Sequence, residues 1–348
     1  MIIKSNKILA IGIATLAGAA TPLIAQQTVS TPIVGFTTLN VRGKTGANNA
    51  LSYISLNLSR PKAFSGTVGT KSLNGSGQTV ITFGSNLFTA NQFNASTNRH
   101  FLQVKSGANN GLVSEVIGTT ENSVTLADDL DGVLENGTTS LDVIPYWTLG
   151  TAFPSAAGLK TGTSATAGDN LTIIDPATGT ANNYFYSSTL NQWRKGTTDS
   201  THVIIPPGAG IMVTRKDATS VGIVTSGQVR TGPVQTDIAA APSTGARVTY
   251  LANPYPLAST TLGQSGLYSG NASTGVAGGT SATAADNVII VDPATGTANS
   301  YFYNTSVGKW RKGVTDSDNV TIPDGSALII SRKANRGSFE WYIPQPTF

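Results

Sequence analysis

The sequence predicts an all-β protein: an N-terminal β-region with a small barrel-like submodule, followed by two homologous antiparallel β-sandwich or barrel domains. Short runs of β-branched and aromatic residues alternate with Gly, Asn, Asp and Pro turns, which is typical of sandwiches and barrels. Only 11% of the residues are charged, so the composition suits sheets with tight turns rather than charged helical surfaces. The third observation is a long block that occurs twice.

Residues 163–216 align with residues 280–333 without a gap, and 32 of the 54 positions are identical. We refer to the two blocks as the first copy and the second copy. Each block is typical of a four-strand meander with an Asp-Pro-Ala-Thr-Gly turn, in which Pro presets φ and Gly accepts a left-handed exit. The duplication therefore predicts a scaffold that is made twice.

The chain begins with the pattern of an export signal. Lys4 and Lys7 precede an apolar stretch that ends in small residues before Gln26, as in cleaved secretory signals. A membrane anchor is the alternative, but the stretch is short and interrupted by Pro22, and no later segment has the ~18 apolar residues that a span needs. The predicted boundaries are a signal peptide at residues 1–25, an N-terminal β-region at 26–144 with its submodule at 100–144, and β-repeat domains at 145–240 and 241–348. We expect a secreted protein, at the cell surface or in the periplasm.

Charge and cysteine content argue against a nucleic-acid-binding protein and against a protein stabilised by disulfides. Without the predicted signal the chain has 20 basic and 18 acidic residues, whereas nucleic-acid binding requires clustered basic residues on one face. The chain has no cysteine, so an exported form must be stabilised by its own core and not by disulfides.

Aromatic residues form the strongest candidate for a binding site. The predicted turn brings Trp193 back beside Tyr184 and Tyr186, which share a strand face because side chains alternate. Exposed rings with an adjacent Arg can stack on sugars or anchor a protein contact. The alternative is that the rings hold the hairpin and cover the core, and their retention in both copies favours it. The candidate binding residues are Tyr184, Tyr186, Trp193 and Arg194, with their counterparts Tyr301, Tyr303, Trp310 and Arg311.

Four Arg-Lys pairs suggest an acidic-polysaccharide surface. Neighbouring residues of a strand point to opposite faces, so each pair places one basic group on each face. We therefore expect solvated strand ends at residues 194–195, 215–216, 311–312 and 332–333.

No metal or cofactor site is predicted. The segment Asp128–Gly132 resembles part of a calcium loop, but it lacks the ligand spacing and the terminal Glu. His100 and His202 are the only histidines, and the second copy has Asn319 in place of His202. A zinc site of Cys and His ligands is therefore excluded. No Gly-rich cofactor loop lies between a strand and a helix.

Catalytic constellations are equally sparse. A Ser-His-Asp triad would need one of the two histidines, and no Gly-x-Ser-x-Gly elbow accompanies them. Paired carboxylates for glycoside hydrolysis stay open, because any two acids can converge in a fold. The duplicated acids lie in turn segments, which favours a structural role: Asp175, Asp292, Asp199 and Asp316. We expect that the protein is not an enzyme.

An ordered series of short motifs runs along the mature chain: Val34-Gly35-Phe36, Arg60-Pro-Lys-Ala-Phe64, Pro145-Tyr-Trp-Thr-Leu-Gly150, the Ile-Pro-x-Gly segments at 205–208 and 322–325, and Asn253-Pro-Tyr-Pro256. In this series the chain resembles an uncharacterised family of exported proteins best known from Verrucomicrobia. The resemblance implies export and an all-β fold. The family has no assigned reaction, so the resemblance implies no catalytic residue.

Together these features predict an exported, non-enzymatic structural or cell-surface interaction protein. Its expected partners are surface polysaccharide, other envelope proteins or further molecules of the same chain. We expect no nucleic acid and no membrane span in the mature chain. The alternative is an extracellular polysaccharide-binding protein that uses the Tyr/Trp hairpins, and a carboxylate-dependent glycan hydrolase comes third. Exposure of the hairpin rings separates the first two hypotheses.

Overall fold

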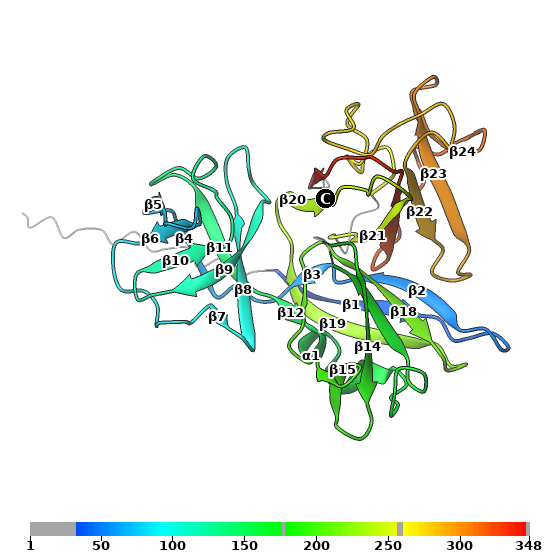
Figure 1. Cartoon of the computed structure of the whole chain (residues 1–348), viewed down its shortest axis with the longest axis horizontal. Helices are drawn as coiled ribbons and strands as arrows, with labels where there is room; N and C mark the ends of the chain where they lie inside the picture. Colours follow the sequence, from blue (N-terminus) through cyan, green and yellow to red (C-terminus); the bar gives the residue numbers. More distant parts are fainter. Residues whose placement is uncertain (1–32, 176–177, 256–259, 346–348) are drawn as a thin grey trace, which may run out of the picture. The chain divides into compact units, whose positions relative to one another are not determined.

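The computed structural model describes residues 33–175, 178–255 and 260–345, so the predicted signal peptide lies outside the described residues. The described chain is nearly all β, as the sequence predicts (Figure 1). Its helical elements are α1 (Leu149–Ala152) and the 3-10 turn η1 (Pro154–Gly158). Neither of these described helices has the length or the apolar content to cross a membrane.

Residues 64–145 form a β-module with its own core. Its sheet runs in the order β4-β11-β8-β9-β10-β6-β5, and β7 pairs with β8. Alternate side chains such as Ile81, Leu102 and Val143 point into one core, where they are fully buried. The strands are β4 (Phe64–Thr67), β5 (Thr70–Leu73), β6 (Thr79–Thr82), β7 (Asn94–Ala95), β8 (Asn98–Val104), β9 (Val113–Thr119), β10 (Ser123–Leu126) and β11 (Ser140–Pro145). The predicted submodule at 100–144 is thus the second part of a larger module.

Strands that precede the 64–145 module complete the sheets of the first copy. One sheet runs β16-β15-β14-β13-β18-β2, another runs β1-β19-β3, and β12 pairs with β17. The strands are β1 (Val34–Val41), β2 (Ala50–Ser55), β3 (Leu58–Ser59), β12 (Trp147–Thr148), β13 (Asn170–Ile174), β14 (Ala181–Ser187), β15 (Gln192–Lys195), β16 (Thr198–Asp199), β17 (Ile204–Ile205), β18 (Gly210–Arg215) and β19 (Val221–Val229). β2 therefore pairs with β18 of the first copy, and β1 and β3 pair with β19, which follows that copy. None of the three pairs within an N-terminal β-region at 26–144.

The second copy repeats this arrangement. Its sheets run β21-β26-β22-β23-β24-β25 and β20-β27. Ile54 of β2 lies opposite Ile211, and Leu251 of β21 lies opposite the equivalent Leu328. The strands are β20 (Val234–Ile238), β21 (Arg247–Ala252), β22 (Asn287–Val291), β23 (Ala298–Asn304), β24 (Lys309–Lys312), β25 (Thr315–Asp316), β26 (Ala327–Arg332) and β27 (Phe339–Ile343). β20 pairs with β27, which follows the second copy, although the predicted boundary at residue 240 assigns β20 to the first repeat domain.

Equivalent strands β2 and β21 lead into different parts of the chain. In the first copy the chain passes from β2 into the 64–145 module, whereas in the second it passes from β21 to β22 without such a module. The module therefore occupies a connection of the first copy.

The two copies also contact each other through equivalent atoms. The amide of Ser55 donates to the carbonyl of Gly325 over 2.9 Å, and the amide of Ala252 donates to the carbonyl of Gly208 over 2.7 Å. Equivalent residues of the two copies also meet in pairs here: Tyr53 with Tyr250, and Gly210 with Ala327. Reciprocal contacts of this kind characterise isologous dimers, and here they join two parts of one chain. The Ile-Pro-x-Gly segments supply both glycine carbonyls.

Gly208 allows a test of this junction. Its φ is +81°, and a Cβ at this position would lie 2.1 Å from Oγ1 of Thr236. We expect Gly208→Ala to lower the free energy of unfolding by about 2–4 kcal/mol, through left-handed strain and overpacking together. Gly245 is the control, because it also has φ +81° but a Cβ there would meet no atom within 4 Å. Equal losses in urea unfolding for Gly208→Ala and Gly245→Ala would contradict a close-packed junction.

Candidate functional site

The duplicated tryptophans lie in the core. Trp193 of β15 and Trp310 of β24 are only 1% and 2% exposed. The indole Nε1 of Trp193 donates to the carbonyl of Phe153 over 3.0 Å, and the two rings meet edge to face. A ring buried on all sides has no face left for a sugar or for a partner side chain. Burial therefore contradicts the binding role considered for both tryptophans.

The hairpin tyrosines support the same conclusion. Tyr184 and Tyr301 are 6% exposed, and burial raises the pKa of each. Tyr186 and Tyr303 are half-buried, and each packs edge to face against the tryptophan of its own hairpin, with ring centroids 5.6 and 5.8 Å apart. A third ring, Tyr268, stacks on Tyr303. The rings hold the hairpins and cover the cores, which was the alternative to binding.

The hairpin arginines face aspartates of the next strand. Arg194 lies opposite Asp199 in the pairing of β15 with β16, and Nη1 of Arg311 lies 3.1 Å from Asp316. A hydrogen bond from Lys309 holds the pKa of Asp316 below its ordinary value, and hydrogen bonds from Thr201 do so for Asp199. Carboxylates with a lowered pKa stay ionised at neutral pH, so neither suits the role of general acid.

The other duplicated aspartates accept hydrogen bonds from backbone amides of their own turns. Asp292 accepts hydrogen bonds from the amides of Ala294 and Thr295 over 2.8 and 3.0 Å, and the two bonds lower its pKa. Asp175 accepts from the amide of Thr178 over 3.0 Å. Both contacts are those of an aspartate that closes a turn on its own backbone.

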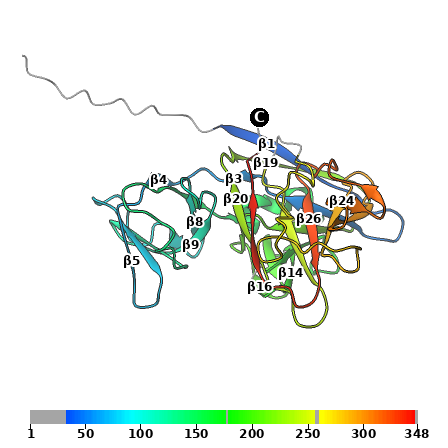
Figure 2. The ribbon, with the colours of Figure 1, turned by 90° about the horizontal axis from the view of Figure 1, so that it is seen from above.

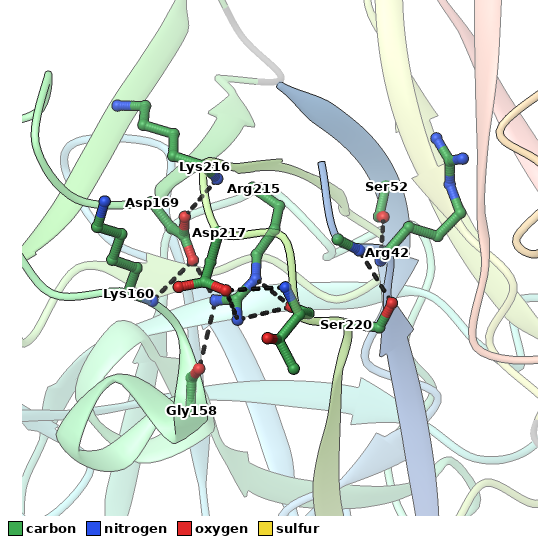
Figure 3. Close-up of polar contacts among 11 residues, drawn as sticks. Arg42, Ser52, Gly158, Lys160, Asp169, Arg215, Lys216, Asp217 and Ser220 are labelled. Carbon is green, nitrogen blue, oxygen red and sulfur yellow. Dashed lines mark hydrogen bonds and ion pairs between the residues drawn. The ribbon is translucent and has the colours of Figure 1, made fainter. Parts of the chain in front are cut away.

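Two buried ion pairs are the polar feature that sequence reasoning missed. In the first copy, Nη1 of Arg215 lies 2.5 Å from Oδ2 of Asp169, with side chains 5% and 0% exposed (Figure 3). In the second copy, Nε of Arg332 lies 3.7 Å from Oδ2 of Asp286, and both side chains are 0% exposed. The prediction of solvated strand ends is therefore wrong for Arg215 and Arg332.

Each ion pair joins the residue just before one strand to the last residue of the neighbouring strand. Asp169 also accepts the amides of Lys160 and Lys216 over 2.7 Å each. Arg215 also donates to the carbonyls of Gly158 and Thr219. Because protein groups surround both charges, the pair stabilises the end of the sheet and presents no group to a ligand.

His100 and the Asp128–Gly132 segment are the residues considered from the sequence as possible metal ligands. The His100 ring is buried, and its Nδ1 lies 3.0 Å from the carbonyl of Phe93. Burial lowers the pKa of His100. In the other segment Asp128 accepts from Ser114 over 2.6 Å, and Asp131 pairs with Lys71. In the described part of the chain, no three His, Asp or Glu side chains gather as metal ligands would.

Three carboxylates that the sequence does not connect line one cavity. The cavity has a volume of about 160 Å³, and its wall includes Glu115 of β9, Asp237 of β20, and Asp128, which follows β10. Nε of Arg99 donates to Glu115 over 2.7 Å. Burial, with a smaller effect of Asp128, raises the pKa of Asp237. The duplicated aspartates do not line this cavity, and two of its three carboxylates are already held by protein donors.

Comparison of this chain with protein-family models, curated proteins and solved structures gives no match. The resemblance to exported verrucomicrobial proteins therefore stays a prediction from the sequence.

Proposed function

We propose that this chain is an exported, non-enzymatic structural or cell-surface interaction protein. The observation that supports this proposal is the use of the duplicated residues inside the fold. The hairpin rings cover the cores, and the duplicated aspartates close turns or neutralise arginines. Polysaccharide binding by the hairpins requires open rings, so the buried tryptophans remove its main support.

The start of β1 offers an exposed surface for such interactions. β1 is the edge strand of the β1-β19-β3 sheet (Figure 2), and its eight residues include no charge and no proline. Val34 and Phe36 are 70% and 80% exposed, and Val224 of β19 is 66% exposed. Native edge strands are usually protected by charges, prolines or covering segments. An unprotected apolar edge therefore marks an interaction site.

Backbone groups at this edge are also available. The amide of Val229 donates to the carbonyl of Ile33, so these two residues form a hydrogen-bonded pair. Along an antiparallel ladder such pairs alternate with pairs whose backbone groups point away from the partner strand. The amides and carbonyls of Val34 and Phe36 therefore point away from β19. No hydrogen bond to these groups from another described residue is present.

The second copy shows how the equivalent edge is covered. Gln235, which corresponds to Thr38, donates its amide to the carbonyl of Gly111 in the 64–145 module over 3.2 Å. Pro233 stands at the position of Phe36. Backbone from another segment thus closes the edge of β20, whereas the start of β1 lacks such a cover among the described residues. We propose that β1 of another molecule of this chain pairs with it antiparallel, because an uncharged strand faces its own copy without repulsion.

Phe36→Lys tests this association. We expect the mature wild-type chain to self-associate in sedimentation experiments and the variant to sediment as a monomer. The stability of the variant should stay within about 0.5 kcal/mol of wild type, because Phe36 is exposed. Leu73→Lys on β5, also an exposed apolar strand position, should leave association intact. A monomeric wild-type chain at all concentrations would refute the self-pairing, and binding of envelope proteins in that case would point to another partner.

A further inference from the structure

Among the described residues, Arg230 is a buried arginine without a counter-charge. It follows β19 in the link between the two copies and is only 9% exposed. Its Nε has no hydrogen-bond partner, and no carboxylate of the described residues forms an ion pair with it. The two other buried arginines, Arg215 and Arg332, each have an aspartate. An uncompensated buried charge is strongly unfavourable, so this exception requires an explanation.

A small cavity lies against the Arg230 side chain. Its wall combines Arg230 with Arg60, Ser59, Phe101, Trp147 and the Pro206–Ala209 turn, and it contains no Asp or Glu. Arg60 uses Nη1 for the carbonyl of Tyr146. The volume of about 10 Å³ accommodates one water-sized group. Two arginine side chains thus line a space of about the size of one water molecule.

The electrostatic setting of this cavity is positive. Burial lowers the pKa of Arg230 to about 10 and also lowers the pKa of Arg60. Burial also lowers the pKa of nearby Lys105; the charge of Asp142 opposes this effect, and the charge of Arg230 adds to it. Each of these shifts reports a cost of keeping a cation in this place. A bound anion would offset that cost, because charge-assisted hydrogen bonds to guanidinium are among the strongest in proteins.

We propose that the cavity is an oxyanion site, in which Arg230 and Arg60 bind one carboxylate or phosphate group through an inserted oxygen. The cavity excludes a whole sugar ring, so the rest of the ligand lies outside it. The group comes from a free small anion or from an acidic sugar, whose carboxylate has the same chemistry. The Pro206–Ala209 turn also contacts the second copy through Gly208, so occupancy strengthens the connection between the 64–145 module and both copies.

Calorimetric titration of the mature chain in chloride-free buffer at constant ionic strength tests the site. The probes are inorganic phosphate, acetate and glucuronate. We expect saturable binding of at least one probe, with a matching rise of the thermal midpoint, since a ligand that binds only the folded state stabilises it. Binding of glucuronate without acetate or phosphate would identify an acidic sugar as the source. Absence of heat and of a midpoint shift with all three probes would overturn the proposal.

Arg230→Met supplies the variant. We expect it to bind the probe at least tenfold more weakly, and to be as stable as wild type or more stable without anion, because it removes an unpaired buried charge. Arg215→Met is the contrast, since it orphans Asp169 and should destabilise. Arg60→Met is a second variant at the more exposed side of the cavity and should also weaken binding. Equal midpoint shifts in wild type and both cavity variants would show only a general salt effect and would reject the site.

Discussion

Asp169→Ala is expected to lower the free energy of unfolding by about 3–5 kcal/mol, because it leaves the buried guanidinium of Arg215 without its counter-charge. The loss also removes the acceptor for the amides of Lys160 and Lys216. Unpaired buried donors add to the destabilisation. Urea unfolding followed by circular dichroism measures the change.

Two comparisons make this result specific. Asp217 also lies near Arg215, at 4.0 Å, but its side chain is 43% exposed, so Asp217→Ala should leave the unfolding midpoint almost unchanged. Replacing both partners, as in Asp169→Ala with Arg215→Met, should recover part of the loss, since no buried charge is then left alone. If Asp169→Ala matched Asp217→Ala, the buried pair would contribute little to the fold.

The second copy should respond less strongly. Asp286 lies 3.7 Å from Nε of Arg332, and Nε and Nη2 of this arginine have no hydrogen-bond partner. Burial also lowers the pKa of Arg332. Asp286 accepts two amides, from Ala277 and Lys333, as Asp169 does, so the difference between the copies lies in the ion pairs. The contact with Arg332 is longer than the one between Asp169 and Arg215, and the second partner of Asp286, Arg336, is 31% exposed, so water can replace that contact.

Local patterns predict strands well and their partners poorly. The apolar and polar alternation from Ile33 to Val41 predicts a strand, and β1 spans Val34–Val41. Its partner is β19, far along the chain, and no local pattern carries that information. The local pattern also predicts one strand over Gly66–Lys71, but the structure has two, β4 and β5, with Val68 and Gly69 between them. A Cβ on Gly69 would lie 2.2 Å from the carbonyl of Thr82, a long-range contact that the local sequence does not show.

The candidate site shows the same division. Strand alternation correctly places Tyr184 and Tyr186 on one face, but alternation does not tell which face points to the core. The sequence does mark the residues of the buried ion pairs, because Asp169 and Arg215 of the first copy align with an identical Asp286 and Arg332 in the second. Reading that signal as a contact requires knowing that β13 and β18 are neighbours. No sequence pattern marks Arg230, because its distinguishing property is that no described carboxylate pairs with it.

Trp193→Ala is expected to lower the free energy of unfolding by about 3–5 kcal/mol, the usual range for removing a large buried aromatic side chain. The loss includes packing against Phe153 and Tyr186 and the hydrogen bond to the Phe153 carbonyl. Trp193→Phe should cost less, because it keeps an aromatic ring in the core. Leu190→Ala is the control, since this residue lies on the turn of the same hairpin and is 55% exposed.

Polysaccharide titration of the same variants separates stability from binding. With Trp193 and Trp310 buried, we expect no polysaccharide to change their fluorescence in the wild-type chain. The decisive variant is Trp193→Phe, which should remain folded and therefore allow a fair comparison of binding. If wild type bound a polysaccharide and Trp193→Phe lost that binding at unchanged stability, the hairpin would be a binding platform. Full burial of the indole argues against that outcome, because a sugar would have to displace core side chains to reach the ring.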